Sequence, residues 1–282
     1  MITAVQQIML GKVTGTEAKA RETLAAVKKA GYDGIELNSF MINPTPFLVR
    51  VLTSLAGMPS GKGGKLDWKR LLDEEKLSVP AVHVDLGSLE RDLKSQVELA
   101  QKYDATNLVI TGMYRFDYRD SDAVSDLCSR LNSAGQKLAE QGIRLLYHNH
   151  NYEFQKMDNG QTAFEYMAEN TKPEFLSFEM DSYWPTEAGV NALNLMKLLG
   201  NRMKLYHIND RGTRLTKPAM TPILKSDSME LGCGNMDLKA LVSQAENAGV
   251  EYIILETHKN WVDGDPVKSL QVSGEYLRNT LG

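Results

Sequence analysis

The feature that most constrains the fold of this chain is a regular alternation of short apolar segments with longer amphipathic ones. Each apolar segment has the length of a strand and is followed by a segment with helical spacing. The expected helices include residues 88–103 and 121–142. The expected strands span residues 2–10, 34–38, 79–86, 107–112, 143–149, 175–181, 203–209 and 252–257. Parallel neighbours in a sheet need crossover connections, so the alternation predicts a parallel sheet.

Eight such units in 282 residues predict an α/β fold, a (β/α)8 TIM barrel, as a single domain over residues 1–282. The chain is 42% hydrophobic, which is enough for a full core. A doubly wound open sheet is the alternative. That fold more typically has a glycine-rich first turn, and no GxGxxG motif occurs in this sequence.

Two segments between the periodic ones read as loops. MPSGKGGK at 58–65, after a helical pattern at 44–57, does not follow a strand and lacks the Walker spacing, so a surface loop is favoured over a phosphate site. Residues 209–235 have no clear periodicity, and loops of that length are often functional.

Charge and composition exclude several classes of protein. The formal net charge is −4 and no basic run occurs, which argues against a nucleic-acid partner. Cys128 and Cys233 form no CxxC pair, so neither a disulfide framework nor a zinc–thiolate site is expected. No apolar run approaches the roughly 18 residues of a membrane helix, and no signal peptide is recognisable, so we expect a cytoplasmic protein without a membrane partner.

In a barrel of this kind the active site lies at the carboxyl ends of the strands. The polar residues at those positions, from the first strand to the eighth, are Gln6, Gln7, Glu36, Asn38, His83, Asp85, Thr111, His148, Asn149, His150, Glu179, Asp181, His207, Asn209, Asp210, Glu256 and His258. All five histidines of the chain are among them. Imidazoles and carboxylates that converge on one mouth are suited to a divalent cation with mixed nitrogen and oxygen ligands.

Several motifs also carry a family resemblance. GYDGIEL, LLYHNHNYEF, FEMDSYWPTEAGVN, KLYHIND, ELGCGNMDL and IILETH lie along nearly the whole chain. Together they resemble the xylose isomerase-like barrels known as sugar phosphate isomerases or epimerases. That superfamily includes ketohexose 3-epimerases, inosose dehydratases and, more distantly, an endonuclease that acts at abasic sites.

The resemblance implies four metal ligands, at the ends of strands five to eight. Three carry over directly as Asp181, His207 and Glu256. The family's first ligand is a glutamate on strand five, but this strand reads LLYHNHN. His148 would take its place, as in the branch that resembles inosose dehydratases, and Glu153 is the competing residue. The ion would be Mn²⁺, Co²⁺, Mg²⁺ or Zn²⁺, because the ligand types do not decide among them.

The missing glutamate bears on the reaction. In the epimerases that the chain resembles, two glutamate ligands move the proton on opposite faces of the substrate. Here the acid–base work would fall to Glu256, Glu153 or His150, since a base must lie within hydrogen-bond reach of the proton.

Further residues are candidates for contact with substrate. Trp184 could stack on a sugar face and His83 could bind a hydroxyl group. Glu36, Asn209 and Arg211 are also candidates. Four of the five have a structural alternative: packing for Trp184, a structural histidine for His83, an internal ion pair for Glu36 and an exposed loop position for Arg211.

The predicted function is therefore a metal-dependent sugar isomerase or epimerase that acts on a keto sugar by enediolate proton transfer. The alternative is a lyase, either an inosose-type dehydratase or an eliminase of a 3-keto sugar or glycoside, that uses the same metal site. The substrate would be a small carbohydrate or cyclitol, and no phosphate-binding motif supports a phosphorylated one. Oligomers are common among such barrels, so a homo-oligomer is compatible with the sequence. An abasic-site endonuclease and a metal-free sugar-binding module are the other classes considered, and metal content separates the latter from the enzymes.

Overall fold

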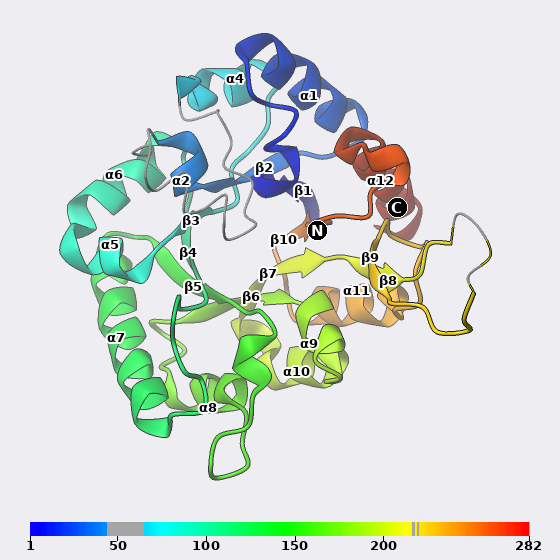
Figure 1. Cartoon of the computed structure of the whole chain (residues 1–282). Coiled ribbons are helices and arrows are strands. Elements are labelled where there is room, and N and C mark those ends of the chain that lie inside the picture. The colour runs from blue at the N-terminus through cyan, green and yellow to red at the C-terminus, as the bar shows by residue number, and fades with distance from the viewer. Residues whose placement is uncertain (44–64, 216–217, 219, 282) are drawn as a thin grey trace. The chain divides into compact units, whose positions relative to one another are not determined.

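The computed structural model describes residues 1–43, 65–215, 218 and 220–281 (Figure 1). Eight strands form a closed barrel in the order β1-β10-β7-β6-β5-β4-β3-β2. Their bounds are β1 (Ile2–Gln6), β2 (Gly34–Asn38), β3 (Val82–Val84), β4 (Asn107–Thr111), β5 (Arg144–His148), β6 (Ser177–Asp181), β7 (Met203–Ile208) and β10 (Tyr252–Leu255). The predicted (β/α)8 barrel of the α/β class is thus confirmed.

Helices follow the strands, as the alternation predicts. They are α1 (Glu17–Lys29), α2 (Ser39–Ile42), α4 (Trp68–Glu74), α5 (Leu86–Arg91), α6 (Leu93–Lys102), α7 (Ser121–Ala139), α8 (Ala163–Asn170), α9 (Tyr183–Glu187), α10 (Ala192–Leu199), α11 (Leu238–Asn247) and α12 (Pro266–Leu281). Short polar side chains fix where several of them begin. Thr16 caps α1, Asp120 caps α7, and Thr162 with Glu165 forms a capping box at α8.

The chain divides into two compact units. The first comprises residues 1–78, 208–239 and 253–282, and the second comprises residues 79–207 and 240–252. In the first unit the Tyr32 hydroxyl donates to the Leu270 carbonyl over 2.9 Å, which fixes the end of α1 against α12. The expectation that residues 1–282 form one domain stays a prediction.

The second unit holds the strands that carry the candidate site. β3 to β7 pair in parallel, each with the next along the chain. Helices α7 and α8 follow β4 and β5 and pack against each other (Figure 1). Because these strands run parallel, their carboxyl ends meet at one edge of the sheet.

Three elements differ from their predicted form. The first strand ends at Gln6, because the Gln6 side chain accepts from the Ile8 N–H and starts the 3₁₀ helix η1 (Gln7–Leu10). The helix expected at 88–103 is two helices, α5 and α6, since Asp92 has a φ of −147° and its side chain caps α6. The segment 209–235 contains an antiparallel hairpin, β8 (Asp210–Gly212) with β9 (Asp227–Met229).

Two predictions cannot be compared with the structure. The helix expected at 44–57 lies outside the described residues, and so does most of the glycine- and lysine-rich segment at 58–65. Among the residues that are described, no helix is both long and apolar enough to cross a membrane.

Candidate metal centre

The candidate centre lies at the carboxyl ends of β5, β6 and β7. The register pairs His148 with Glu179, and Asp181 with His207. Strands paired in this way end at similar levels, so their last side chains are neighbours. His148, Asp181 and His207 are all buried. The structure therefore brings three of the four predicted ligands together.

These three side chains fit a divalent cation. Each offers one ligand atom, and these atoms lie within 4.8 Å of one another. Atoms that share one cation at bond lengths of about 2.0–2.2 Å are separated by at most about 4.4 Å, so small movements would bring all three into contact with it. Imidazole suits zinc and neighbouring metals, while carboxylate also suits magnesium and manganese. Burial of an ionised carboxylate costs free energy unless a cation or hydrogen bonds compensate its charge.

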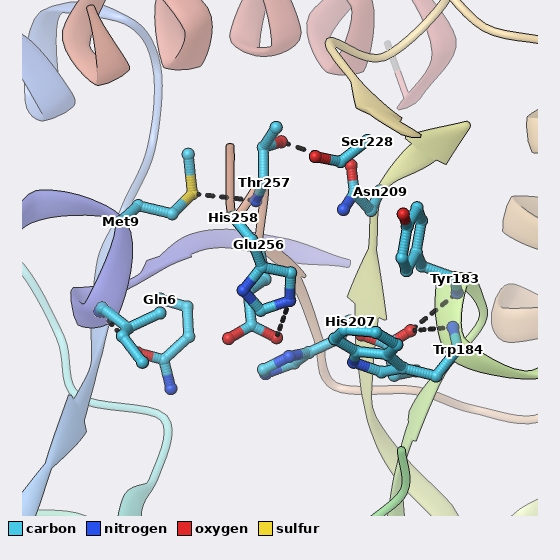
Figure 2. Close-up of polar contacts among 12 residues, drawn as sticks. Gln6, Met9, Tyr183, Trp184, His207, Asn209, Ser228, Glu256, Thr257 and His258 are labelled. Carbon is cyan, nitrogen blue, oxygen red and sulfur yellow. Dashed lines mark hydrogen bonds and ion pairs between the residues drawn. The ribbon is translucent and has the colours of Figure 1, made fainter. Parts of the chain in front are cut away.

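Asp181 is fixed by its own strand end. One carboxylate oxygen, Oδ1, accepts from the backbone N–H groups of Tyr183 and Trp184, over 2.6 and 3.1 Å (Figure 2). The Asn149 amide makes two bonds to the Asp181 backbone, of 3.0 and 3.1 Å. The carboxylate is thus held at the start of α9 through Oδ1.

Glu256, the fourth predicted ligand, directly follows β10 in the first unit and is buried. Its backbone N–H donates to the carbonyl of Ile208, the residue after His207, over 3.2 Å. His258 Nε2 lies 3.8 Å from the Glu256 carboxylate (Figure 2). Its role as a metal ligand stays a prediction.

Glu179 is the centre of a histidine cluster in the second unit. Its Oε2 lies 3.0 Å from His83 Nε2, 3.1 Å from His148 Nδ1 and 3.3 Å from His207 Nε2. Burial by itself raises the pKa of this carboxyl, but the charges of His207 and His83 and the contacts of His148 and His207 hold the pKa well below its ordinary value. Glu179 is therefore ionised.

His83 uses both ring nitrogens inside this unit. Nδ1 lies 2.6 Å from Thr111 Oγ1, and Nε2 faces Glu179. These contacts match the structural alternative for His83 more closely than contact with a substrate hydroxyl.

Glu153 lies in the 3₁₀ helix η3 (Tyr152–Phe154) and is buried. Its Oε1 accepts from the Tyr147 hydroxyl over 2.8 Å, and its Oε2 accepts from the His150 N–H over 3.1 Å. The Tyr147 hydroxyl in turn lies 2.7 Å from that of Tyr118. Burial raises the pKa of Glu153 to about 7, and the hydrogen bonds from Tyr147 and the backbone only partly offset it. Such a carboxyl can hold or release a proton near neutral pH.

His150 lies beside the predicted ligands and beside Trp184. Its ring centroid is 4.9 Å from that of His148 and 5.4 Å from that of Trp184. The predicted acid–base residue His150 and the predicted sugar-stacking residue Trp184 are therefore neighbours at one end of the second unit.

The remaining predicted contacts lie in the first unit. Glu36 is buried at the end of β2, and its Oε2 accepts from Gln6 Nε2 over 3.1 Å. Asn209 is buried, and its Oδ1 accepts from the Thr257 hydroxyl over 3.4 Å. The Thr257 backbone N–H also donates to Met9 Sδ, over 3.2 Å (Figure 2).

Arg211 lies in β8, beside an aspartate that organises the hairpin. The carboxylate of Asp210 accepts from four backbone N–H groups, those of Arg211, Gly232, Gly234 and Met236, over 2.8 to 3.1 Å. Asp210 is therefore a structural anchor. Arg211 is half-buried, not on a fully exposed loop.

Two features of the site were not predicted. Glu179 was expected at a strand end, on the same strand face as Asp181, but no role was predicted for it. The Tyr118–Tyr147–Glu153 chain was missed altogether. The glutamate of NYEF was its one signal in the sequence. Tyr118 lies in the connection after β4, and its contact with Tyr147 of β5 is formed only in the folded chain.

Comparison with known proteins places the chain in a family. The family model for the xylose isomerase-like TIM barrel matches residues 24–280. None of the curated proteins matches the sequence.

Solved structures share the fold. A sugar phosphate isomerase/epimerase from Parabacteroides distasonis is 19% identical with a TM-score of 0.77, over 98% of this chain and 93% of that one. The probable 3-DHS dehydratase AsbF from Bacillus anthracis is 11% identical with a TM-score of 0.68, over 99% of each chain. The IOLI protein with a bound zinc atom is 12% identical with a TM-score of 0.65, over 100% of this chain and 98% of that one.

At sequence identities of 11–19%, the solved structures show only that the fold is shared. The family model, in contrast, matches most of the sequence. The chain belongs to the xylose isomerase-like TIM barrel family.

Proposed function

We propose that this protein is a divalent-cation-dependent isomerase or epimerase that acts on a keto sugar by enediolate proton transfer. The observation that carries the proposal is the convergence of His148, Asp181 and His207, three buried side chains whose ligand atoms lie within 4.8 Å of one another. Glu256 would be the fourth ligand. Its backbone bond to Ile208, next to His207 in the chain, supports that role.

When bound, a divalent cation at these residues would polarise a substrate carbonyl and acidify the hydrogen on the neighbouring carbon. His150 is the side chain beside the ligand set that could take up that proton, with its ring 4.9 Å from that of His148. Glu256 is the alternative base. The proposed cation is Mn²⁺, Co²⁺, Mg²⁺ or Zn²⁺. The IOLI structure, which has a similar fold, contains a zinc atom, and this is compatible with the proposal.

Glu153 would serve as the proton reservoir behind His150. Its pKa of about 7 allows it to exchange a proton near neutral pH, and its Oε2 holds the His150 backbone. Both of its oxygens accept hydrogen bonds, which favours this role over that of the strand-five metal ligand.

We assign contact with the substrate to Trp184, Glu36, Asn209 and Arg211. Trp184 is best supported, because its ring lies 5.4 Å from that of His150 and an indole face suits the apolar face of a sugar. The substrate class would be an unphosphorylated keto sugar, cyclitol or keto-glycoside.

One observation favours a lyase as the second candidate. β5 ends in His148 and is followed by Asn149 and His150, without the glutamate that would place a base on one face of the substrate. A site with its acid–base groups on one side suits loss of water or of an aglycone from the carbon next to an acidified C–H. The probable 3-DHS dehydratase AsbF has the same fold.

Proton NMR in D₂O tests the two candidates together. The Mn²⁺-loaded enzyme is offered ketohexoses, inosose and 3-keto-glucosides, and small-molecule signals are read after removal of the protein. Deuterium at the α-carbon, together with the epimer or isomer, is the result expected for the isomerase. An enone signal together with loss of water or of the aglycone would instead identify the protein as a lyase. Absence of exchange with every substrate would contradict both.

A further inference from the structure

Two side-chain amides of the first unit have a buried NH₂ group that no neighbour satisfies. Gln7 is the first residue of η1, directly after β1, and Asn209 directly follows β7. Both residues are fully buried. Neither Gln7 Nε2 nor Asn209 Nδ2 has a hydrogen-bond partner within the part of the chain that the structure describes. Buried donors are normally hydrogen-bonded, because an unpartnered donor has lost its bonds to water without replacement.

Backbone groups fix which end of each amide is the donor. Gln7 Oε1 accepts from the Asn38 N–H over 2.9 Å. Asn209 Oδ1 accepts from the Asp210 N–H over 2.9 Å, and the Thr257 hydroxyl approaches the same oxygen to 3.4 Å. A backbone N–H can only donate, so it is the oxygen of each amide that faces it. The two atoms without a partner are therefore nitrogens, which donate and do not accept.

Both amides lie at the rim of the barrel that carries the candidate site. In the order of the strands β10 lies between β1 and β7, so Glu256, directly after β10, has one amide on either side along this rim. Asn209 follows His207 by two positions, which is the spacing of side chains on one face of a strand. The two donors thus flank one predicted ligand, and one of them is next to another.

The segments that carry the two amides are held firmly. After Asn209 comes Asp210, the anchor of the β8–β9 hairpin. Before Gln7 comes Gln6, whose Oε1 accepts from the Ile8 N–H and from Asn38 Nδ2, over 2.9 and 2.7 Å. Donors that are fixed before a ligand arrives lose little conformational freedom when they bind it.

The chemistry of an amide NH₂ group defines the ligand atoms that it can bind. It is uncharged and only donates, so its partners are carbonyl, hydroxyl or enediolate oxygens. A keto sugar or a cyclitol carries such oxygens on neighbouring carbons. A fixed donor beside an oxygen that gains negative charge stabilises the enediolate more than the substrate.

We propose that Gln7 and Asn209 bind the substrate through their NH₂ groups, each of which donates to one substrate oxygen. Asn209, close in sequence to the predicted ligand His207, donates to the oxygen that becomes negative in the enediolate. Gln7 donates to a hydroxyl group of the same substrate. The pair favours sugars with oxygens on both sides of Glu256 over their deoxy analogues. The role of Asn209 in the reaction rests on the proposed function, whereas that of Gln7 requires only that a sugar binds.

NMR of the side-chain NH₂ groups of ¹⁵N-labelled protein tests both contacts without turnover. The probe is D-glucitol, a hexitol with hydroxyl groups like those of a ketohexose but no carbonyl, so it cannot be enolised. Gln7→Glu and Asn209→Asp each remove one signal and so assign it. We expect both signals to shift saturably when glucitol is added to the Zn²⁺-loaded protein.

Two results of this titration would overturn the proposal. In the first, glucitol shifts other signals but not these two, which would mean that buried water satisfies the donors. In the second, glucitol changes no signal at any concentration.

The same two variants measure what each donor contributes. Both keep the oxygen that accepts from the backbone and replace the NH₂ group by an oxygen that cannot donate. Each should weaken glucitol binding by about 10-fold, and Asn209→Asp should also lower kcat by about 100- to 1000-fold. Gln271→Glu makes the same change of charge at an exposed position of α12 in the first unit and should alter neither quantity. Glucitol affinities of both variants equal to that of Gln271→Glu would overturn the proposal.

The two proposals can fail separately. A wild-type protein that binds glucitol through both amides but exchanges no α-hydrogen of any keto sugar would contradict the proposed function and leave a sugar-binding site. Exchange in wild type with an unchanged kcat in Asn209→Asp would leave the function standing and remove Asn209 from the reaction. Should a variant not fold, the titration of the wild-type protein still decides, with the signals assigned from its backbone resonances.

Discussion

At the scale of the residue, the site depends on how each buried carboxyl is satisfied. Asp181 has one oxygen bonded to the start of α9, and Glu153 has both oxygens bonded, to Tyr147 and to the His150 backbone. The sequence predicted that Asp181 ends a strand, but it did not predict the bonds of Asp181 to α9. The bonds of Glu153 depend on a loop that folds back onto β5, and no periodicity in the sequence encodes such a contact.

The raised pKa of Glu153 predicts a specific dependence of stability on pH. Its ordinary value is 4.5 and burial raises it to about 7, so between these pH values the folded chain binds more protons than the unfolded one. Stability from this group is fully present below pH 4.5 and is lost as the pH rises through 7. Relative to Glu153→Gln, wild type should lose about 3 kcal/mol between pH 4.5 and 8.

Urea unfolding of both proteins in chelator, across that pH range, measures this loss. Tyr147→Phe is a useful control, because loss of its hydrogen bond should move the transition to higher pH. A stability difference between wild type and Glu153→Gln that does not vary with pH would show that Glu153 is not protonated in this range.

Two substitutions at Asp181 should separate metal binding from local structure. Asparagine keeps an oxygen that can accept from the N–H groups of Tyr183 and Trp184, but it lacks the charge, whereas alanine lacks both. In chelator, Asp181→Asn should unfold within about 1 kcal/mol of wild type, and Asp181→Ala should be about 1–3 kcal/mol less stable. Both should weaken cation binding by about 100-fold or more. Equal cation affinity in wild type and Asp181→Asn would exclude Asp181 as a ligand.

At the scale of the element, the sequence predicted the helices and strands well where periodicity is strong. The helix expected at 121–142 is α7 (Ser121–Ala139), and the strand expected at 175–181 ends, as expected, at Asp181. The errors occur where a single side chain overrides the pattern. The caps by Gln6 and Asp92 end one strand early and divide one helix. The β8–β9 hairpin depends on Asp210, whose four backbone partners lie up to 26 positions away.

Gly135 shows a constraint on α7 that helix propensity does not reveal. A Cβ at this position would lie 1.9 Å from the Phe175 carbonyl oxygen, so the helix can pack here only with glycine. Gly135→Ala gains about 1 kcal/mol of helix propensity and should nevertheless destabilise the protein by about 2–4 kcal/mol. Gly15→Ala is the control, because nothing lies within 4 Å of its added Cβ. Urea unfolding compares the two, and a stabilised Gly135→Ala would disprove the packing.

At the scale of the whole molecule, the alternation of segments was sufficient to predict the (β/α)8 barrel and the edge at which the site would lie. The positions of His148, Asp181 and His207 follow from strand ends in parallel register. The cluster of three histidines around Glu179 does not, since it needs side chains from β3, β5 and β7 to reach one carboxylate of β6.

A cation that binds only the folded chain must raise its thermal stability. With free cation at about 100 times its dissociation constant, the gain is about 2.7 kcal/mol, which for a chain of this size raises Tm by about 5–10 °C. Scanning fluorimetry in Mn²⁺ and in chelator measures the shift. His207→Gln should abolish it. An equal shift in wild type and His207→Gln would mean that the stabilising ion binds elsewhere.

The most direct test of the central claim is anomalous diffraction from crystals grown with Mn²⁺, measured on both sides of the manganese absorption edge. We predict an anomalous peak within about 2.0–2.3 Å of one atom each of His148, Asp181 and His207. A map with no peak at these three residues, or with its peak bound to other side chains, would contradict the metal centre and the chemistry proposed for it.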